Sequence, residues 1–316
     1  MKKKFLALTL SACMAASLAA CGGSKPAETT AAAETTEAAS ETTAAAGSEA
    51  ESTEAESTEA EAAKVETVTE GKLTVATSPD FAPYEFYAIG EDGKPALAGF
   101  DMALAQYIAD HMGLELEVVT VDFDGVLSEL QTKSVDLGMA GLSPDPKREG
   151  IMDFSDIYYM GGQSLVTVKA NADTFNTFEA INKSDVSVGA QTGSIQMDLA
   201  NTNSPDADII ALPKVTDIIS ELLAGKMDAA FIETDVAKSY QKNYPDLEIV
   251  MDVPYDTEGS SVGVSKDNAA LLAGVNEAIA AAKEDGSLEK FIADANEQAS
   301  GEKYEGLLDA EGKTQQ

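Results

Sequence analysis

The stretch that decides the fold lies near the middle of the chain and reads Ala140-Gly141-Leu142-Ser143-Pro144-Asp145-Pro146-Lys147-Arg148. The apolar residues of 135–142 predict a strand that is buried on both faces. Asp145 and Pro146 are typical of the N-cap and the first position of a helix, which would place Arg148 in the first helical turn. A strand that passes directly into a helix is the repeating unit of α/β sheets.

The same alternation of strands and helices continues on both sides of this stretch. Further strands are predicted at 73–76, 114–121, 163–168, 186–190, 209–212, 229–232, 248–251 and 261–264, with a hairpin formed by 86–90 and 95–100. Helices are predicted at 101–112, 126–132, 217–224, 235–243, 268–283 and 288–295. We therefore expect an α/β fold with helices on both faces of its sheet. Ligands bind such sheets beyond the carboxyl ends of the strands, so candidate residues are sought there.

Arg148 is the only arginine among the 316 residues, beside 20 lysines. A guanidinium group near the Ser143 hydroxyl and free backbone amides suits a carboxylate, because it donates two parallel hydrogen bonds. A lysine does not offer this planar geometry. The alternative interpretation is an arginine in a surface turn.

Two other strand ends carry polar groups. Gly193 and Ser194 follow one strand and, with the next backbone amides, form a small nest for an anion; many such turns have no function. Glu233 ends another strand and is a candidate partner for a ligand ammonium group, although a solvated carboxylate is the alternative. Thr234 is predicted to cap the helix that follows.

Two aromatic residues, Phe81 and Phe123, are predicted in loops after strands. Aromatic side chains in such loops either cover the core or form the walls of a small-molecule pocket.

Composition narrows the function. The chain has 55 acidic and 21 basic residues and a formal net charge of −34, which disfavours a nucleic-acid partner. One histidine and two cysteines leave little room for a histidine-rich metal site or a Ser-His-Asp triad. We expect no catalytic residues, no metal site and no cofactor.

The N-terminus predicts export. Three lysines precede the apolar run 5–20, which is typical of a signal peptide (1–20) and too short to span a membrane. Leu18-Ala19-Ala20-Cys21 resembles the bacterial lipobox, which implies that Cys21 carries the lipid, palmitate included, and anchors the protein outside the cell membrane. An ordinary signal peptide is the alternative, with Cys21 incidental.

Residues 21–70 are rich in Ala, Thr, Ser and Glu and contain no aromatic residue. Such a segment buries too little apolar area to offset its ordering entropy, so we expect a disordered tether with a span of roughly 40 Å. A helix is the less favoured alternative. Residues 304–316 are expected to be a polar tail.

Three motifs carry a family resemblance: Gly99-Phe100-Asp101-Met102-Ala103-Leu104, Leu130-Gln131-Thr132-Lys133-Ser134-Val135-Asp136 and Asp153-Phe154-Ser155-Asp156-Ile157-Tyr158-Tyr159. Over residues 72–295 the chain resembles the amino-acid-binding solute receptors (family 3) of bacterial ABC importers, nearest to the glutamine-binding types. The resemblance implies a two-lobe, periplasmic-binding-protein-like (type II) fold with discontinuous lobes. Lobe one would comprise 71–162 and 259–303, and lobe two 163–258.

The resemblance also assigns roles at both ends of a bound amino acid. Arg148 and Ser143 match the residues that hold its α-carboxylate, and Gly193 and Ser194 match a second carboxylate contact from the other lobe. The ammonium group would be met by the Gly141 carbonyl and by Glu233, where the family usually has Asp.

For the ligand side chain, Phe81 and Phe123 match the aromatic pair that encloses it. Ser78 stands where glutamine receptors carry Asp, and Gly189 where they carry Lys. A neutral polar amino acid, not specifically glutamine, is therefore expected.

The function implied is that of an extracytoplasmic lipoprotein, monomeric and not an enzyme, that closes around a free amino acid and delivers it to an ABC permease. Two alternatives stay open: an enzyme on the same fold, similar to cyclohexadienyl dehydratase, or a binding protein that serves a sensor.

Overall fold

The structure is a computed structural model that describes residues 65–90, 93–256, 259–299 and 301. All of these residues fall within one compact unit of the chain, 60–316. The predicted signal peptide, Cys21, most of the predicted tether, the turn residues 91–92 and the polar tail lie outside the described residues.

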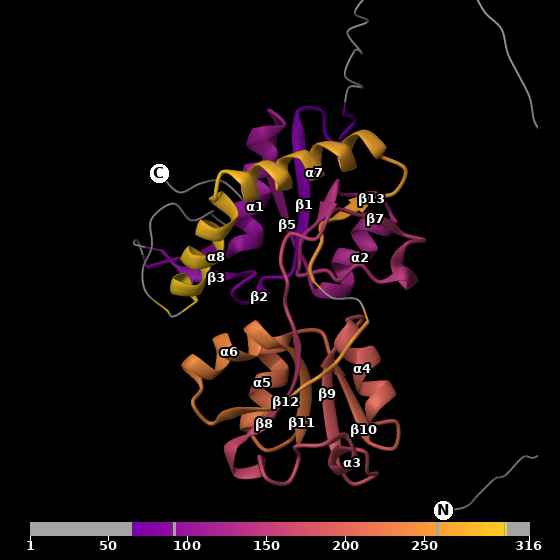
Figure 1. Ribbon diagram of the computed structural model, residues 1–316, viewed down its shortest axis with the longest axis vertical. Coiled ribbons are helices and arrows are strands. Elements are labelled where there is room, and N and C mark those ends of the chain that lie inside the picture. Colours follow the sequence, from indigo (N-terminus) through magenta and orange to yellow (C-terminus); the bar gives the residue numbers. More distant parts are fainter. Residues whose placement is uncertain (1–64, 91–92, 257–258, 300, 302–316) are drawn as a thin grey trace, which may run out of the picture. The chain divides into compact units, whose positions relative to one another are not determined.

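The first sheet combines strands from both ends of the described chain. Its order is β5-β1-β6-β13-β7, and β1 pairs in parallel with β5 and β6, whereas β13 is antiparallel to β6 and β7. The strands are β1 (Lys72–Thr77), β5 (Glu115–Thr120), β6 (Leu137–Gly138), β7 (Met152–Phe154) and β13 (Gly263–Ser265). Because β13 comes from the C-terminal part, this lobe is discontinuous in sequence (Figure 1).

Helices cover both faces of the first sheet. One face packs against α1 (Phe100–His111), α7 (Ala269–Glu284) and α8 (Ser287–Gln298), and the other against α2 (Phe123–Gln131). The predicted hairpin is present as β3 (Glu85–Ile89) and β4 (Pro95–Ala98), joined by β2 (Asp80–Phe81) in a small antiparallel sheet.

The second sheet has the order β10-β9-β11-β8-β12. Its strands are β8 (Gln163–Val168), β9 (Ser187–Gln191), β10 (Asp208–Leu212), β11 (Ala229–Glu233) and β12 (Leu247–Asp252). Its core clusters place α5 (Val215–Leu223) and α6 (Thr234–Asn243) on one face and α3 (Phe178–Ile181) and α4 (Ile195–Asn203) on the other.

Two chain segments connect the sheets, and Figure 1 shows both of them. One lies between β7 and β8 and the other between β12 and β13, and they meet in an antiparallel bridge between Tyr159 and Ser260. The predicted α/β class and the division into two lobes, of which the first is discontinuous in sequence, are confirmed. The exact lobe boundaries stay predictions.

Two expectations around Arg148 were wrong. The strand predicted at 135–142 pairs only over Leu137–Gly138, because the chain turns away at Gly141, whose φ is +56°. The predicted helix is a single 3-10 turn, η1 (Pro146–Arg148). Gly150, a poor helix former, follows this turn closely.

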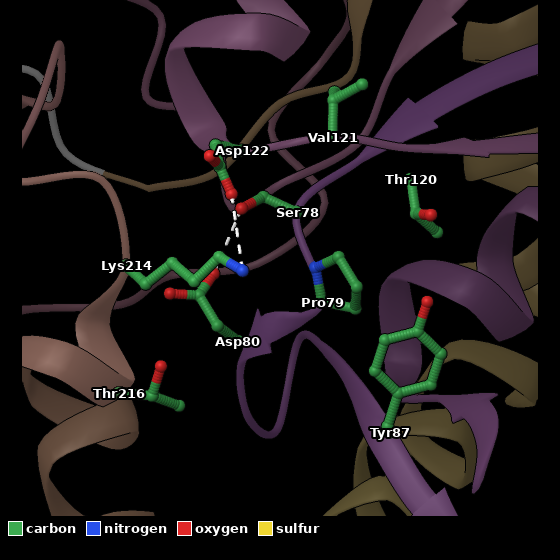
Figure 2. Close-up of a pocket in the computed structure, with 9 residues that line it drawn as sticks. All are labelled: Ser78, Pro79, Asp80, Tyr87, Thr120, Val121, Asp122, Lys214 and Thr216. Atoms are coloured by element: carbon green, nitrogen blue, oxygen red, sulfur yellow. Dashed lines mark hydrogen bonds and ion pairs between the residues drawn. The ribbon is translucent and has the colours of Figure 1, made fainter.

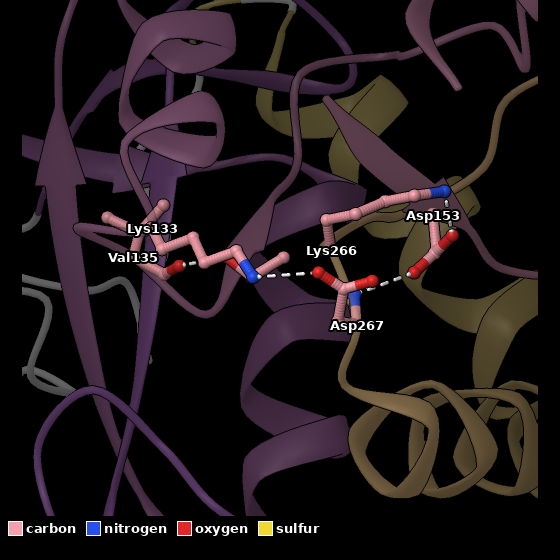
Figure 3. A network of polar contacts seen from close by, with 6 residues as sticks. Lys133, Val135, Asp153, Lys266 and Asp267 are labelled. Atoms are coloured by element: carbon pink, nitrogen blue, oxygen red, sulfur yellow. Dashed lines mark hydrogen bonds and ion pairs between the residues drawn. The ribbon is translucent and has the colours of Figure 1, made fainter. Parts of the chain in front are cut away.

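The first described residues, 65–70, pack against the first lobe, although the tether was predicted to extend to residue 70. The Val68 amide donates to Asp136 Oδ1 over 2.8 Å, and Asn268 donates to the Glu66 carbonyl over 2.8 Å. Close by, the ion pairs Lys133–Asp267 (3.1 Å) and Lys266–Asp153 (2.5 Å) link the turn after α2, the segment after β13 and strand β7 (Figure 3). Among the described residues, no helix has the length and apolar character that a membrane crossing requires.

Candidate functional site

Arg148 is held by a short turn at the edge of the first lobe. The Asp145 carboxylate accepts a hydrogen bond from the Lys147 amide (2.9 Å), and the Asp145 carbonyl accepts one from the Arg148 amide (2.9 Å). The predicted capping role of Asp145 is confirmed, although the helix it was expected to begin is absent. A three-residue turn has no substantial dipole, so Arg148 owes its position to these local bonds.

The Arg148 guanidinium is buried, and no carboxylate among the described residues forms an ion pair with it. Its side chain is 8% exposed, and its Cζ lies 5.6 Å from the centre of the Phe123 ring. Nη2 donates to the Gly193 carbonyl over 3.0 Å. Burial lowers the pKa of Arg148. No carboxylate of the described residues lies within 4.0 Å of the guanidinium nitrogens, so most of its donors face no acceptor there.

Gly193 and Ser194 belong to the second lobe, at the turn between β9 and α4. Gly193 has a φ of +76°, which favours glycine. Ser194 caps α4: its hydroxyl accepts from the Met197 amide (3.3 Å) and donates to the Gln191 carbonyl (2.7 Å). The structure therefore brings Gly193 to Arg148, whereas the Ser194 hydroxyl bonds within its own turn.

Glu233 ends β11 and caps α6, the position that the sequence assigned to Thr234. Its side chain is 4% exposed; Oε2 accepts from the Val236 amide (2.8 Å) and Oε1 from the Gly162 amide (3.2 Å). Desolvation raises the pKa of Glu233 to about 7, against the stabilising effect of these amides. Thr234 instead shares a hydrogen bond with Ser164 (2.8 Å).

Glu233 and Tyr84, from different lobes, converge on Gly161 in the connecting segment. A Cβ atom at position 161 would lie 2.6 Å from Glu233 Oε1 and 2.6 Å from the Tyr84 hydroxyl oxygen. Only glycine leaves both side chains where they are.

The predicted aromatic pair lies in regular elements and not in loops. Phe81 is in β2, and its ring would be 2.9 Å from a Cβ atom at Gly141. Phe123 is the first residue of α2 and lies beside the Arg148 guanidinium. Ser143 is buried, and its hydroxyl makes no hydrogen bond to another described residue.

Asp101, which sequence reasoning left without a role, supports the Gly141 turn. Oδ2 accepts from the Gly141 amide (3.1 Å), and Oδ1 accepts from the Tyr158 hydroxyl (2.6 Å). Burial raises the pKa of Asp101 to about 6. Its place in the Gly-Phe-Asp motif was the signal that could have identified it.

Ser78 lies in a cavity of about 460 Å³ that residues of both lobes line (Figure 2). Its hydroxyl donates to Asp80 Oδ1 over 2.9 Å. Asp80 also accepts from the Val215 amide at the start of α5, and Lys214 lies 3.6 Å from Asp122. Asp80, Asp122 and Lys214 were not predicted, because they meet only when the lobes do.

Known proteins resemble this chain over most of its length. The profile of the family described as bacterial extracellular solute-binding proteins, family 3, matches residues 73–295. The arginine-binding extracellular protein ArtP of Bacillus subtilis is 30% identical over 293 residues, which cover 92% of this chain and 96% of that protein. The L-cystine-binding protein TcyJ of Escherichia coli is 28% identical over 219 residues, 69% of this chain and 80% of that protein.

A solved structure is similar as well. The amino acid ABC transporter substrate-binding protein AbpA of Streptococcus pneumoniae, bound to L-arginine, has a TM-score of 0.70 and 35% identity, and the match covers 73% of this chain and 97% of that one. These relatives are named for arginine and cystine, so the expected likeness to glutamine-binding types is not confirmed.

Proposed function

The chain belongs to the bacterial extracellular solute-binding proteins of family 3, and from that premise we propose that it binds a free amino acid between its lobes for uptake by an ABC importer. The relatives described above are binding proteins and not enzymes.

The Arg148 environment is the observation that carries the proposal. Keeping a guanidinium buried without an anionic partner costs several kcal/mol in typical cases. A ligand carboxylate would supply the missing charge and accept two parallel hydrogen bonds. Because Gly193 of the other lobe already contacts Arg148, a carboxylate bound here would be enclosed from both sides.

The ammonium end has two supports. Glu233 is a buried carboxylate close to the segment that connects the lobes, and the Gly141 carbonyl belongs to a turn fixed by Asp101. We infer that the ligand ammonium ionises Glu233 on binding, since a nearby positive charge favours the charged form of a carboxyl group. Ser143 completes the carboxylate side. The family resemblance adds Ser194, whose hydroxyl would have to exchange its bond to the Gln191 carbonyl for the ligand.

Contacts between the lobes support a mechanism in which the ligand stabilises the closed state. The Lys147–Asp198 pair (2.6 Å) and the Asp80 contact with Val215 join the lobes in this structure. A ligand that contacts both lobes binds the closed state more tightly than the open one and shifts the population toward closure by that difference. We place the lobes at 71–162 with 259–303, and at 163–258.

The side chain of the ligand is proposed to be cationic, in place of the neutral polar side chain expected from sequence. Asp80 and Asp122 line the cavity beside Ser78, against one cation, Lys214. This excess of carboxylates favours a positive ligand group over a negative one. Two of the relatives, ArtP and AbpA, are named for or bound to arginine.

Anchoring and partners follow from the N-terminal sequence and the family. We propose that Cys21 is lipidated, that 21–64 tether the body to the outer face of the cell membrane, and that a permease receives the amino acid. We further propose a monomer without enzymatic activity. The dehydratase alternative would require turnover of a substrate, whereas a binding protein returns its ligand unchanged.

A thermal-shift screen of the mature protein against the twenty amino acids, ornithine and cystine tests the function. We expect arginine or a related cation to raise the melting temperature most. Prephenate and arogenate, followed by absorbance, form the enzymatic arm. A flat profile with every amino acid would contradict the proposal, and turnover would favour the enzyme.

A further inference from the structure

Glu85 is a completely buried carboxyl group in the floor of the first lobe. It lies in β3 with 0% of its surface exposed, and neither carboxyl oxygen receives a hydrogen bond from a donor of the described residues. An ionised carboxylate in this position would lose its hydration without compensation, at a cost that proteins avoid by keeping such a group neutral.

Asp101 is the group that a neutral Glu85 can serve. It lies beside Glu85, because its amide donates to the carbonyl of Tyr84, the preceding residue (2.9 Å), while its carboxylate accepts from the Tyr158 hydroxyl and the Gly141 amide. Two ionised carboxylates cannot share such a contact, but an acid and a carboxylate can, because the acid donates its proton.

We propose that Glu85 is a positioning residue of the amino-acid site: as a neutral carboxylic acid it donates a hydrogen bond to Asp101, which in turn holds the Gly141 turn at the ligand ammonium group. This inference rests on the proposed function for the role of Gly141. The neutral state of Glu85 follows from its complete burial without a hydrogen-bond donor among the described residues, and it does not depend on the ligand.

The surroundings of Glu85 assign the proton to it and the negative charge to Asp101. The charged groups that act on Glu85 are Asp101 from α1 and Asp80 from β2, and Tyr158 is the neighbouring hydroxyl group. Burial and the two aspartates raise the pKa of Glu85 well above its ordinary value. Asp101, which accepts from Tyr158, Gly141 and Glu85, keeps a pKa of about 6 and is the anion of the pair near neutral pH.

The Gly141 turn has little freedom to compensate for a lost support. Gly141 has a φ of +56°, and a Cβ atom there would meet both the Phe81 ring (2.9 Å) and the Tyr84 ring (3.3 Å). Backbone movement at this point therefore displaces the Gly141 carbonyl and the aromatic wall together. Asp101 is the acceptor that fixes the amide side of the turn.

Two substitutions separate positioning from packing. Glu85→Gln keeps a donor for Asp101, whereas Glu85→Met has similar length and no donor. With folding verified by circular dichroism, we expect Glu85→Gln to bind the amino acid found in the screen within about threefold of wild type, and Glu85→Met to bind it at least tenfold more weakly. Equal affinities of the two variants would overturn the positioning role.

The proton itself is tested on ligand-free protein. At pH 8, where Glu233 is mostly ionised, the protonated-carboxyl band in infrared spectra should be stronger in the wild type than in Glu85→Gln by close to one carboxyl group. From about pH 4.5 upward, the unfolding equilibrium constant of the wild type, relative to that of Glu85→Gln, should rise by about tenfold per pH unit. The proton on Glu233 is common to both proteins, whereas only the wild type must also keep a proton at position 85 to stay folded.

Bands of equal strength in the two proteins, or a stability difference that does not change with pH, would overturn the neutral state. Failure of every amino acid to bind would contradict the proposed function instead, and the spectra would still decide the state of Glu85.

Discussion

Arg148 of the first lobe donates a hydrogen bond from Nη2 to the carbonyl oxygen of Gly193 in the second lobe, 3.0 Å away. The acceptor is a neutral carbonyl, and the bond involves one of the three guanidinium nitrogens. The cation that we assign to the ligand carboxylate therefore also links the lobes, so that binding and closure depend on the same side chain.

Replacement of this guanidinium gives the first prediction. Arg148→Lys should weaken binding of the amino acid at least about tenfold, since loss of bidentate geometry to a charged group costs roughly 1.5–3 kcal/mol. Isothermal titration calorimetry measures the affinity. Lys226→Met is the control, because Lys226 is exposed and pairs with Glu221 on the surface (3.0 Å). Wild-type affinity in Arg148→Lys would remove this residue from the site.

The second prediction concerns the proton on Glu233. With a pKa of about 7 in the ligand-free protein, Glu233 is mostly protonated at pH 6. A bound ammonium group favours the carboxylate, so binding at pH 6 should release close to one proton, and binding at pH 8 far less. Calorimetric enthalpies at pH 6 should therefore change with the ionisation enthalpy of the buffer. Glu233→Gln should bind the amino acid more weakly, and its binding enthalpy should not depend on the buffer. If the binding enthalpy of Glu233→Gln still changed with the buffer, the released proton would come from another group.

The same group makes the stability of the ligand-free protein depend on pH. Its pKa is raised from 4.5 to about 7 on folding, so its contribution to stability is complete below pH 4.5 and is lost as the pH rises toward 7. Relative to Glu233→Gln, the wild type should lose on the order of 2–3 kcal/mol of unfolding free energy over this range. Urea unfolding at several pH values measures the difference; a constant difference would show that burial leaves Glu233 ionised.

Local pattern was sufficient for the strands and for Arg148. Apolar runs between turn residues gave β8 its observed bounds, Gln163–Val168, and a guanidinium at a strand end indicated an anion site. Local sequence pattern did not predict features that depend on contacts between segments far apart in the sequence. Thr is a far more common N-cap than Glu. Glu233 nevertheless caps α6, because its buried carboxylate also accepts a hydrogen bond from the Gly162 amide in the connecting segment.

Buried acids were beyond local pattern for a similar reason. An acidic residue before an alternating strand is ordinarily solvated, and only the folded chain places Glu85 against Asp101. The cavity beside Ser78 likewise forms from two lobes whose sequences are far apart.

The third prediction tests the contact at Gly161. In Gly161→Ala, the added Cβ atom would force Glu233 and Tyr84 to move, and Glu233 would lose its bond to the Gly162 amide. We expect about tenfold weaker ligand binding and a loss of 1–3 kcal/mol in stability, typical of overpacking. The control is Gly150→Ala, where no atom beyond the neighbouring residues lies within 4 Å of the new Cβ. Its dissociation constant for the ligand and its free energy of unfolding should both stay near those of the wild type. Unchanged ligand affinity in Gly161→Ala would show that Glu233 does not contact the ligand.

The fourth prediction fixes where the folded body begins. A protein that starts at Val65 should match the melting temperature and affinity of the mature chain, if residues 22–64 are only a tether. A protein that starts at Gly71 loses the Val68 amide that serves the buried Asp136, at a cost of roughly 1–3 kcal/mol, or about 3–8 °C in melting temperature.

Ligand affinity should stay the same in both truncated proteins, because Asp136 lies at the opposite ends of the strands from Ser78. Differential scanning calorimetry with and without the amino acid measures both effects. Equal melting temperatures for the two proteins would show that Val65–Glu70 add nothing to the fold, and a loss in the longer one would show that 22–64 do more than tether.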